Sequence, residues 1–115
     1  MESLKDKITI GMNTDLEEFG NLIHEERMIK KGKGIIDRAS LSVVAMLGYL
    51  SREHYPGSLV PRQIKNVGEL YSFTGYEIRY KFSKYGKKTW QKLNKHLMDR
   101  ELPPLKLPPK YIDPQ

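Results

Sequence analysis

The chain has 115 residues, of which 38% are hydrophobic, and this length and composition suit one domain with a single core. It contains no cysteine, which excludes disulfides and thiolate metal sites. The N-terminus is interrupted by charges and shows no signal peptide, and the longest apolar run, Val43 to Leu47, is far too short to span a membrane. We therefore expect a cytoplasmic protein without a membrane partner.

The formal net charge of +6 is distributed unevenly along the chain. Residues 1–37 carry eight Asp/Glu and six Lys/Arg, whereas residues 38–115 carry six Asp/Glu and fourteen Lys/Arg. A basic half of this kind favours a nucleic-acid partner. A solvated surface that keeps the protein soluble explains the same charge, so charge alone leaves both interpretations open.

The first predicted helix begins at a capping box formed by Thr14 and Glu17. It ends near Lys31, because Gly32 and Gly34 follow a run of basic residues. Its apolar positions recur at helical spacing and are Leu16, Phe19, Leu22 and Ile23.

A second helix is expected from an N-cap at Asp37 to about Glu53. Apolar residues surround most of it, which predicts the central buried helix. Gly48 in its middle lowers helix propensity and indicates that another helix approaches closely there. Pro56 and Pro61 mark the loop that follows.

Two further capping signatures predict short helices. Asn66 and Glu69 open a helix through about Ser72, and Thr74 opens another through about Phe82. Apolar residues in the second of these alternate in a way that also fits a strand; they are Tyr76, Ile78, Tyr80 and Phe82. The spacing from Thr74 to Glu77 favours the helix.

The last predicted helix spans about Lys87 to Asp99, because Trp90, Leu93 and Leu97 are spaced i, i+3, i+7. Trp90 is expected in the core rather than as a base-stacking surface. The segment 102–109 contains four prolines and is expected to be extended and polyproline-like. The fold class predicted is all-α: a compact bundle of about five helices, some short, with an extended Pro-rich tail.

The last helix and the residues before it carry the clearest candidate site. Residues 79–100 contain eight Lys/Arg and one acidic residue. Gly86 directly before a helix exposes backbone N–H groups at the positive end of the helix dipole, which is an anion site. Lys87, Lys88 and Thr89 would contact the same phosphate and position the protein without reading base sequence. A short turn with solvated lysines is the alternative.

Several short motifs resemble the C-terminal domain of the bacterial RNA polymerase alpha subunit. They are Val67–Leu70, Glu77–Ile78, Tyr85–Trp90 with Leu93, and Leu41–Leu50, which resembles the first helix of that family. The resemblance implies a bundle of short helices with a helix–hairpin–helix-like element. It also implies binding to the DNA minor groove and contact with transcription activators.

The chain departs from that family at the residues that read DNA sequence. Val44 and Leu47 stand where the family has an arginine and an asparagine, and neither can hydrogen-bond a base edge. Lys84 and Lys92 replace an asparagine and an acidic residue, and the segment 52–62 is additional. The resemblance therefore carries over phosphate contacts but not sequence readout.

No catalytic or metal site is predicted. The three histidines, His24, His54 and His96, lack metal-ligand spacing. Ser40 and Ser42 have no histidine in a plausible local arrangement. We therefore expect no enzyme activity and no cofactor.

These observations predict three regions: an N-terminal helical arm and linker (1–36), a helical domain like that of the alpha subunit (37–107) and a tail (108–115). The predicted function is non-catalytic binding to the DNA backbone, associated with transcription, with DNA and a protein of the transcription machinery as partners. The alternative is a protein-interaction module that keeps the fold without DNA readout. The predicted nucleic-acid-binding residues are Arg79, Lys84, Gly86, Lys87, Lys88, Thr89, Lys92 and Lys95.

Overall fold

The computed structural model describes residues 10–52, 63–72 and 85–111, and the regular elements in these ranges are helices. This confirms the predicted all-α class. The elements are α2 (Leu16–Gly32), α3 (Arg38–Ser51), α4 (Val67–Leu70), α6 (Lys87–Met98) and the short 3₁₀ helix η1 (Pro109–Tyr111). The helix predicted from Thr74 to Phe82 lies outside the described residues. No helix in the described ranges is long and apolar enough to cross a bilayer.

The start of α2 is set by tertiary contacts, and the capping box predicted at Thr14 is wrong. The Thr14 hydroxyl accepts a hydrogen bond from the Gly11 N–H (2.9 Å), and the N-cap is Asp15, whose side chain makes no capping bond. The Leu16 N–H instead bonds to the Lys65 carbonyl (2.9 Å). The first N–H group of α2 is therefore satisfied by the segment that leads into α4.

Helix α2 ends in a Schellman motif built on Gly34. The Ile35 N–H bonds to the Lys30 carbonyl (2.9 Å) and the Gly34 N–H to the Lys31 carbonyl (3.0 Å). Gly34 has φ of +84°, a left-handed conformation that a side chain disfavours. The two glycines predicted to end the helix therefore do so, with Gly34 making the turn.

Helix α3 begins at the predicted N-cap, since the Asp37 carboxylate accepts the Ser40 N–H (3.0 Å). The close helix approach predicted at Gly48 is wrong, because a Cβ there would meet nothing within 4 Å. The glycine at the α2–α3 contact is Gly20, where a Cβ would lie 3.6 Å from the Leu47 Cβ. The glycine at which the two helices approach each other therefore belongs to α2 and not to α3.

The N-cap predicted at Asn66 is confirmed, because its side chain accepts the Glu69 N–H (3.0 Å). After α6 the chain turns back across the same helix. The Asn94 side chain bonds both the N–H (2.8 Å) and the carbonyl (3.2 Å) of Leu105. Leu105 and Tyr111 are buried there.

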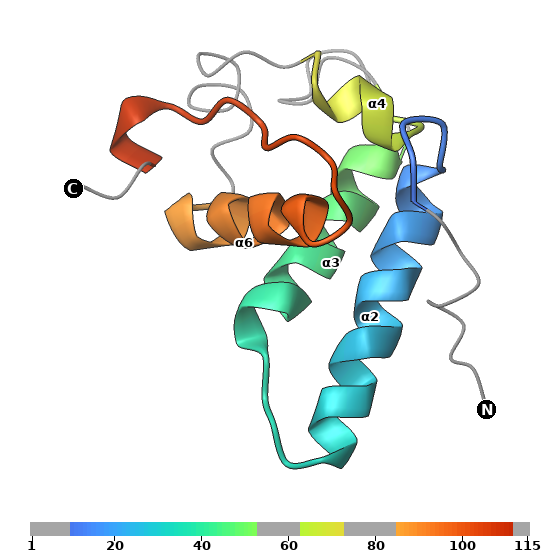
Figure 1. Cartoon of the computed structure of the whole chain (residues 1–115), viewed down its shortest axis with the longest axis vertical. Coiled ribbons are helices and arrows are strands. Elements are labelled where there is room, and N and C mark those ends of the chain that lie inside the picture. Colours follow the sequence, from blue (N-terminus) through green and yellow to red (C-terminus); the bar gives the residue numbers. More distant parts are fainter. Residues whose placement is uncertain (1–9, 53–62, 73–84, 112–115) are drawn as a thin grey trace.

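Figure 1 shows α2 and α3 as an antiparallel hairpin and α6 lying across α3. The turn between α2 and α3 projects beyond α6. All these helices share one core, in which Trp90 of α6 is fully buried, as predicted. Helix α2, which belongs to the region predicted as an arm, contributes Leu16, Phe19, Leu22 and Ile23 to the same core.

Candidate nucleic-acid interface

Helix α6 begins where the sequence places it and brings part of the predicted site to the surface. Gly86 is its N-cap, with extended backbone (φ −91°, ψ −173°), and Gly86 and Lys88 are exposed. Extended backbone is open to any residue, so Gly86 is not required by its dihedral angles. Arg79 and Lys84 lie outside the described residues.

Thr89 does not suit the phosphate contact predicted for it. It is only 9% exposed and lies in the buried part of the α6 surface. Lys87 is half-buried, whereas Lys88 next to it is exposed. The predicted phosphate contacts around the helix start are therefore not all available on one open surface.

Three lysines of α6 share one face. Lys88, Lys92 and Lys95 are spaced i, i+4, i+7, which places them in line along the helix. Lys92 and Lys95 line a hollow of about 130 Å³ between α2, the start of α3 and α6. The same hollow is lined from α2 by Arg27 and Lys30.

We call this surface the basic corner and define it as Arg27, Lys30, Lys88, Lys92 and Lys95. It borders the hollow between α2, the start of α3 and α6. Cations separated by about sixty residues in sequence converge here. Arg27 and Lys30 were not among the predicted site residues, because residues 1–37 hold more acidic than basic residues and their net charge gave no sign of a basic surface.

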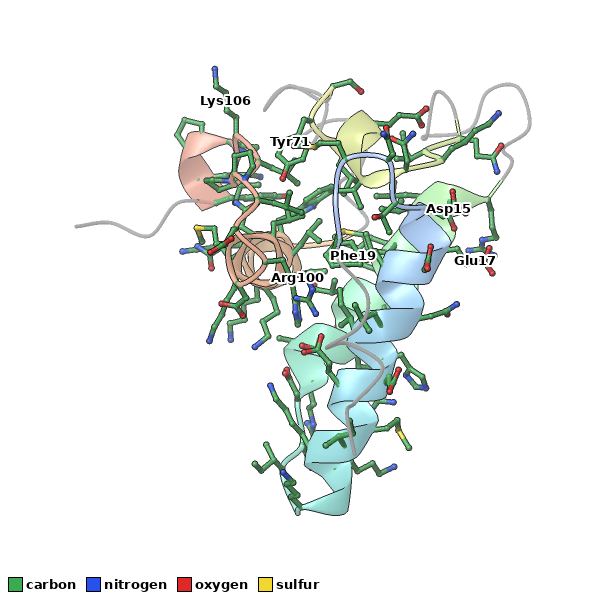
Figure 2. All side chains as sticks on the ribbon, turned by 45° about the vertical axis from the view of Figure 1, so that its right-hand side comes forward. Asp15, Glu17, Phe19, Tyr71, Arg100 and Lys106 are labelled. Carbon is green, nitrogen blue, oxygen red and sulfur yellow. The ribbon has the colours of Figure 1, made fainter. Side chains whose placement is uncertain are left out.

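Charge is segregated along α2. Glu17 and Glu18 lie in its first turn, and Lys30 and Lys31 lie in its last. Figure 2 shows Asp15 and Glu17 at the end of α2 remote from the hairpin turn. Counting charged residues turn by turn along the predicted helix, instead of over residues 1–37 together, would have indicated the basic end of α2.

Asp37 neutralises part of the corner. Its carboxylate accepts the Ser40 hydroxyl (2.8 Å) and lies 3.3 Å from the Lys30 Nζ and 3.5 Å from the Lys92 Nζ. Burial alone would raise the pKa of Asp37, but hydrogen bonds from Ser40 and the charge of Lys92 lower it well below its usual range. Lys30 and Lys92 are therefore held in the corner by a permanent anion.

The remaining cations of the corner are not neutralised in this way. Within the described ranges, Lys88 and Lys95 form no ion pair. Arg27 approaches His24 (3.4 Å), but its buried Nε has no hydrogen-bond partner there. Besides Asp37, the carboxylates of Glu26 and Asp99 also line the hollow.

A second polar group links α3 to α6 beneath the corner. His96 Nε2 lies 2.8 Å from the Ser40 hydroxyl, and both residues are buried, at 8% and 1% exposure. The sequence prediction that Ser40 has no nearby histidine holds only locally, because His96 arrives from 56 residues away. Burial, together with the charges of Arg100 and Lys92, lowers the pKa of His96 to about 4.

The direction of these hydrogen bonds does not suit nucleophilic catalysis. The Ser40 hydroxyl has one hydrogen and donates it to the Asp37 carboxylate. The neutral His96 ring therefore donates its Nε2–H to Ser40 and cannot accept the Ser40 proton in this arrangement. We interpret the group as a structural link between α3 and α6.

Arg100 closes the corner at the end of α6. Its guanidinium forms an ion pair with Glu26, donates to the His96 carbonyl (3.0 Å) and lies 5.5 Å from the centre of the Phe19 ring. Figure 2 shows Arg100 beside Phe19. These contacts hold α6 against α2, so this cation has a structural role.

Comparison with known proteins adds no relative, since no family model, no curated protein and no solved structure matches the chain. Fold and site define a small all-α protein with cations from two helices gathered on one surface. The resemblance to the RNA polymerase alpha subunit stays a prediction.

Proposed function

We propose that this protein binds nucleic acid non-catalytically through the phosphate backbone, with the basic corner as the contact surface. The observation that carries this proposal is the alignment of Lys88, Lys92 and Lys95 on the face of α6 that borders the same hollow as Arg27 and Lys30. Lysine and arginine side chains on two helices can each approach a different phosphate of one strand.

The geometry supports backbone contact rather than base readout. Lysine binds phosphate as a point charge, and such contacts carry no sequence information. Val44 and Leu47, at the family's two readout positions, are partly or fully buried and apolar. We therefore expect binding that is strongly dependent on salt and nearly indifferent to sequence.

The resemblance supports the finer part of the proposal. In this proposal, the whole chain forms a bundle of about five helices with a helix–hairpin–helix-like element and an extended tail. Its partner is duplex DNA, and it acts in the cytoplasm in association with transcription. The experiment below tests the partner directly.

The test is a fluorescence-anisotropy titration of the full chain against a labelled random-sequence duplex at about 50 and 200 mM salt. Each phosphate neutralised should contribute about −0.9 to the log–log salt slope. The double substitution Lys88→Glu with Lys95→Glu should weaken binding by about tenfold or more at the lower salt, because it reverses two cations of the corner. Circular dichroism should be unchanged, since both side chains are exposed.

The matched control is Lys65→Glu with Lys106→Glu, which changes net charge equally at exposed positions outside the corner. Lys106 lies on the tail, on the far side of α6 from the hairpin turn (Figure 2). The control should bind much more tightly than the corner variant. Equal weakening in both would show that only net charge matters and would overturn the proposed surface.

A protein-interaction module is the second candidate. Leu41 on α3 is 48% exposed, and other large apolar side chains are exposed nearby at the hairpin turn. Such residues often mark contacts with a partner protein. Absence of any duplex or single-strand binding at 50 mM salt would favour this second function.

A further inference from the structure

The turn that projects from the helical body has an unusual composition. Residues 27–36, which we call the hairpin tip, contain four cations, four large aliphatic residues and two glycines, but no acidic residue. No residue of the tip is buried. Its aliphatic members and their exposed fractions are Met28 (45%), Ile29 (45%), Ile35 (54%) and Ile36 (63%).

The tip is a defined structure rather than a loose loop. Its Schellman bonds bring the Ile35 N–H onto the Lys30 carbonyl, and this motif usually brings an apolar residue at Ile35 against the last turn of the helix. Asp37 then caps α3 and lies 3.3 Å from the Lys30 Nζ. Ile35 and Ile36 are thus held at the apex between two capped helix ends.

We propose that the hairpin tip enters the minor groove of duplex DNA and inserts Ile35 and Ile36 as an apolar wedge at a base step, which bends the duplex. This inference rests on the proposed function and adds the groove, the wedge and the deformation. Isoleucine is among the side chains that proteins insert between base steps, and such wedges kink DNA by roughly 20–90°. Lys31 and Lys33, both exposed, would contact the flanking phosphates.

Charge complementarity favours DNA as the occupant, since the hairpin tip holds four cations and no acidic residue. Arg27 and Lys30 belong to both the tip and the basic corner, so cations extend from α6 towards the apex, with the Asp37 carboxylate between Lys30 and Lys92.

The test is a duplex of about 25 base pairs labelled at both ends for energy transfer, titrated with the full chain. Wild-type protein should raise transfer efficiency on binding, because a bend brings the ends together. Ile35→Ser with Ile36→Ser should abolish that rise while affinity stays within about fivefold, since the phosphate contacts that supply most affinity are retained. Met12→Ser with Met98→Ser, which removes two exposed methionines outside the tip, should bend DNA as the wild type does.

The outcomes separate this inference from the function on which it depends. If the wild-type protein does not bind the duplex, both the proposed function and the wedge are contradicted. Binding without a rise in energy transfer, or an equal rise in the Ile35/Ile36 variant, would overturn the wedge and leave backbone binding intact. Loss of wild-type binding to phosphatidylserine vesicles in that variant, with unchanged DNA bending, would assign the tip to lipid and overturn the inference.

Discussion

Burial and the positive charges of two neighbouring residues both lower the pKa of His96. Desolvation disfavours the imidazolium, and Arg100 and Lys92 add like-charge repulsion, while Glu26 and Asp37 oppose them. In the folded protein its pKa is lowered to about 4, whereas an unfolded chain restores the ordinary value near 6.5. The His96 Nε2 remains 2.8 Å from the Ser40 hydroxyl in this buried setting.

The lowered pKa makes stability depend on pH in a defined window. Between pH 6.5 and 4 the unfolded chain binds a proton at His96 that the folded protein does not, so the free energy of unfolding should fall as pH decreases. The loss should reach roughly 3 kcal/mol near pH 4. Urea denaturation at intervals across this range measures it.

His96→Gln should remove most of this dependence, because glutamine does not titrate. His24→Gln, at an exposed position of α2, should keep the wild-type profile. Asp37 does not obscure the comparison, since its pKa is depressed and its contribution to stability is lost only as pH falls below the usual range of a carboxyl. Identical slopes for wild type and His96→Gln would contradict the assigned role.

The polar residues of α6 show which part of the candidate site can be predicted from the sequence. Lysines spaced i, i+4, i+7 along α6 share a face in any helix, so Lys88, Lys92 and Lys95 could be grouped without a structure. The burial of Thr89 at the start of the same helix could not be predicted from the sequence. It depends on which side of α6 meets the core, and α2, α3 and the tail decide that together.

Among the elements, the ends of helices were predicted best where the cap lies within the segment. Asp37 and Asn66 cap α3 and α4 through bonds to residues three positions later, and such bonds need no distant partner. Thr14 looked equally suitable. Its hydroxyl is taken by the Gly11 N–H, and Lys65 supplies the acceptor at the start of α2.

Gly34 and Gly48 of the α2–α3 hairpin, at both of which an added Cβ would meet no neighbour, make a paired prediction. Gly34→Ala should lower the free energy of unfolding by about 1–2 kcal/mol, because φ of +84° is left-handed. Gly48→Ala should raise it by about 0.5–1 kcal/mol, because Gly48 is helical, exposed and has open space around the new methyl. Urea denaturation of both variants gives the two signs.

Opposite changes in the free energy of unfolding for Gly34→Ala and Gly48→Ala would identify backbone conformation, and not side-chain packing, as the cause. Both positions have nothing within 4 Å of the added Cβ, so steric contact cannot account for a difference. A destabilised Gly48→Ala would contradict the open space around Gly48 on α3.

In the whole molecule, α2 and α6 belong to one core although the chain between them is long. Ile23 of α2 and Trp90 of α6 are both fully buried within it. The chain has a single tryptophan, so its fluorescence reports the part of the core around α6. This permits a direct measurement of cooperativity between the two ends of the protein.

Ile23→Val should lower the free energy of unfolding by about 1 kcal/mol, since it removes one buried methylene. The shift in the urea midpoint should be the same by Trp90 fluorescence and by far-ultraviolet circular dichroism, as expected for a two-state domain. A dichroism shift with an unchanged fluorescence midpoint would show instead that residues 10–36 fold as a separate arm.

The sequence alone determined the helical class, the start of α3, the bounds of α6, the burial of Trp90 and the basic character of the last helix, because helical periodicity, local caps and charge are properties of neighbouring residues. Tertiary structure decided what those helices bring together. Arg27 and Lys30 join the lysines of α6, and His96 reaches Ser40, only because α2, α3 and α6 pack on one core, and packing between distant segments depends on the shape and volume of side chains that no local pattern encodes.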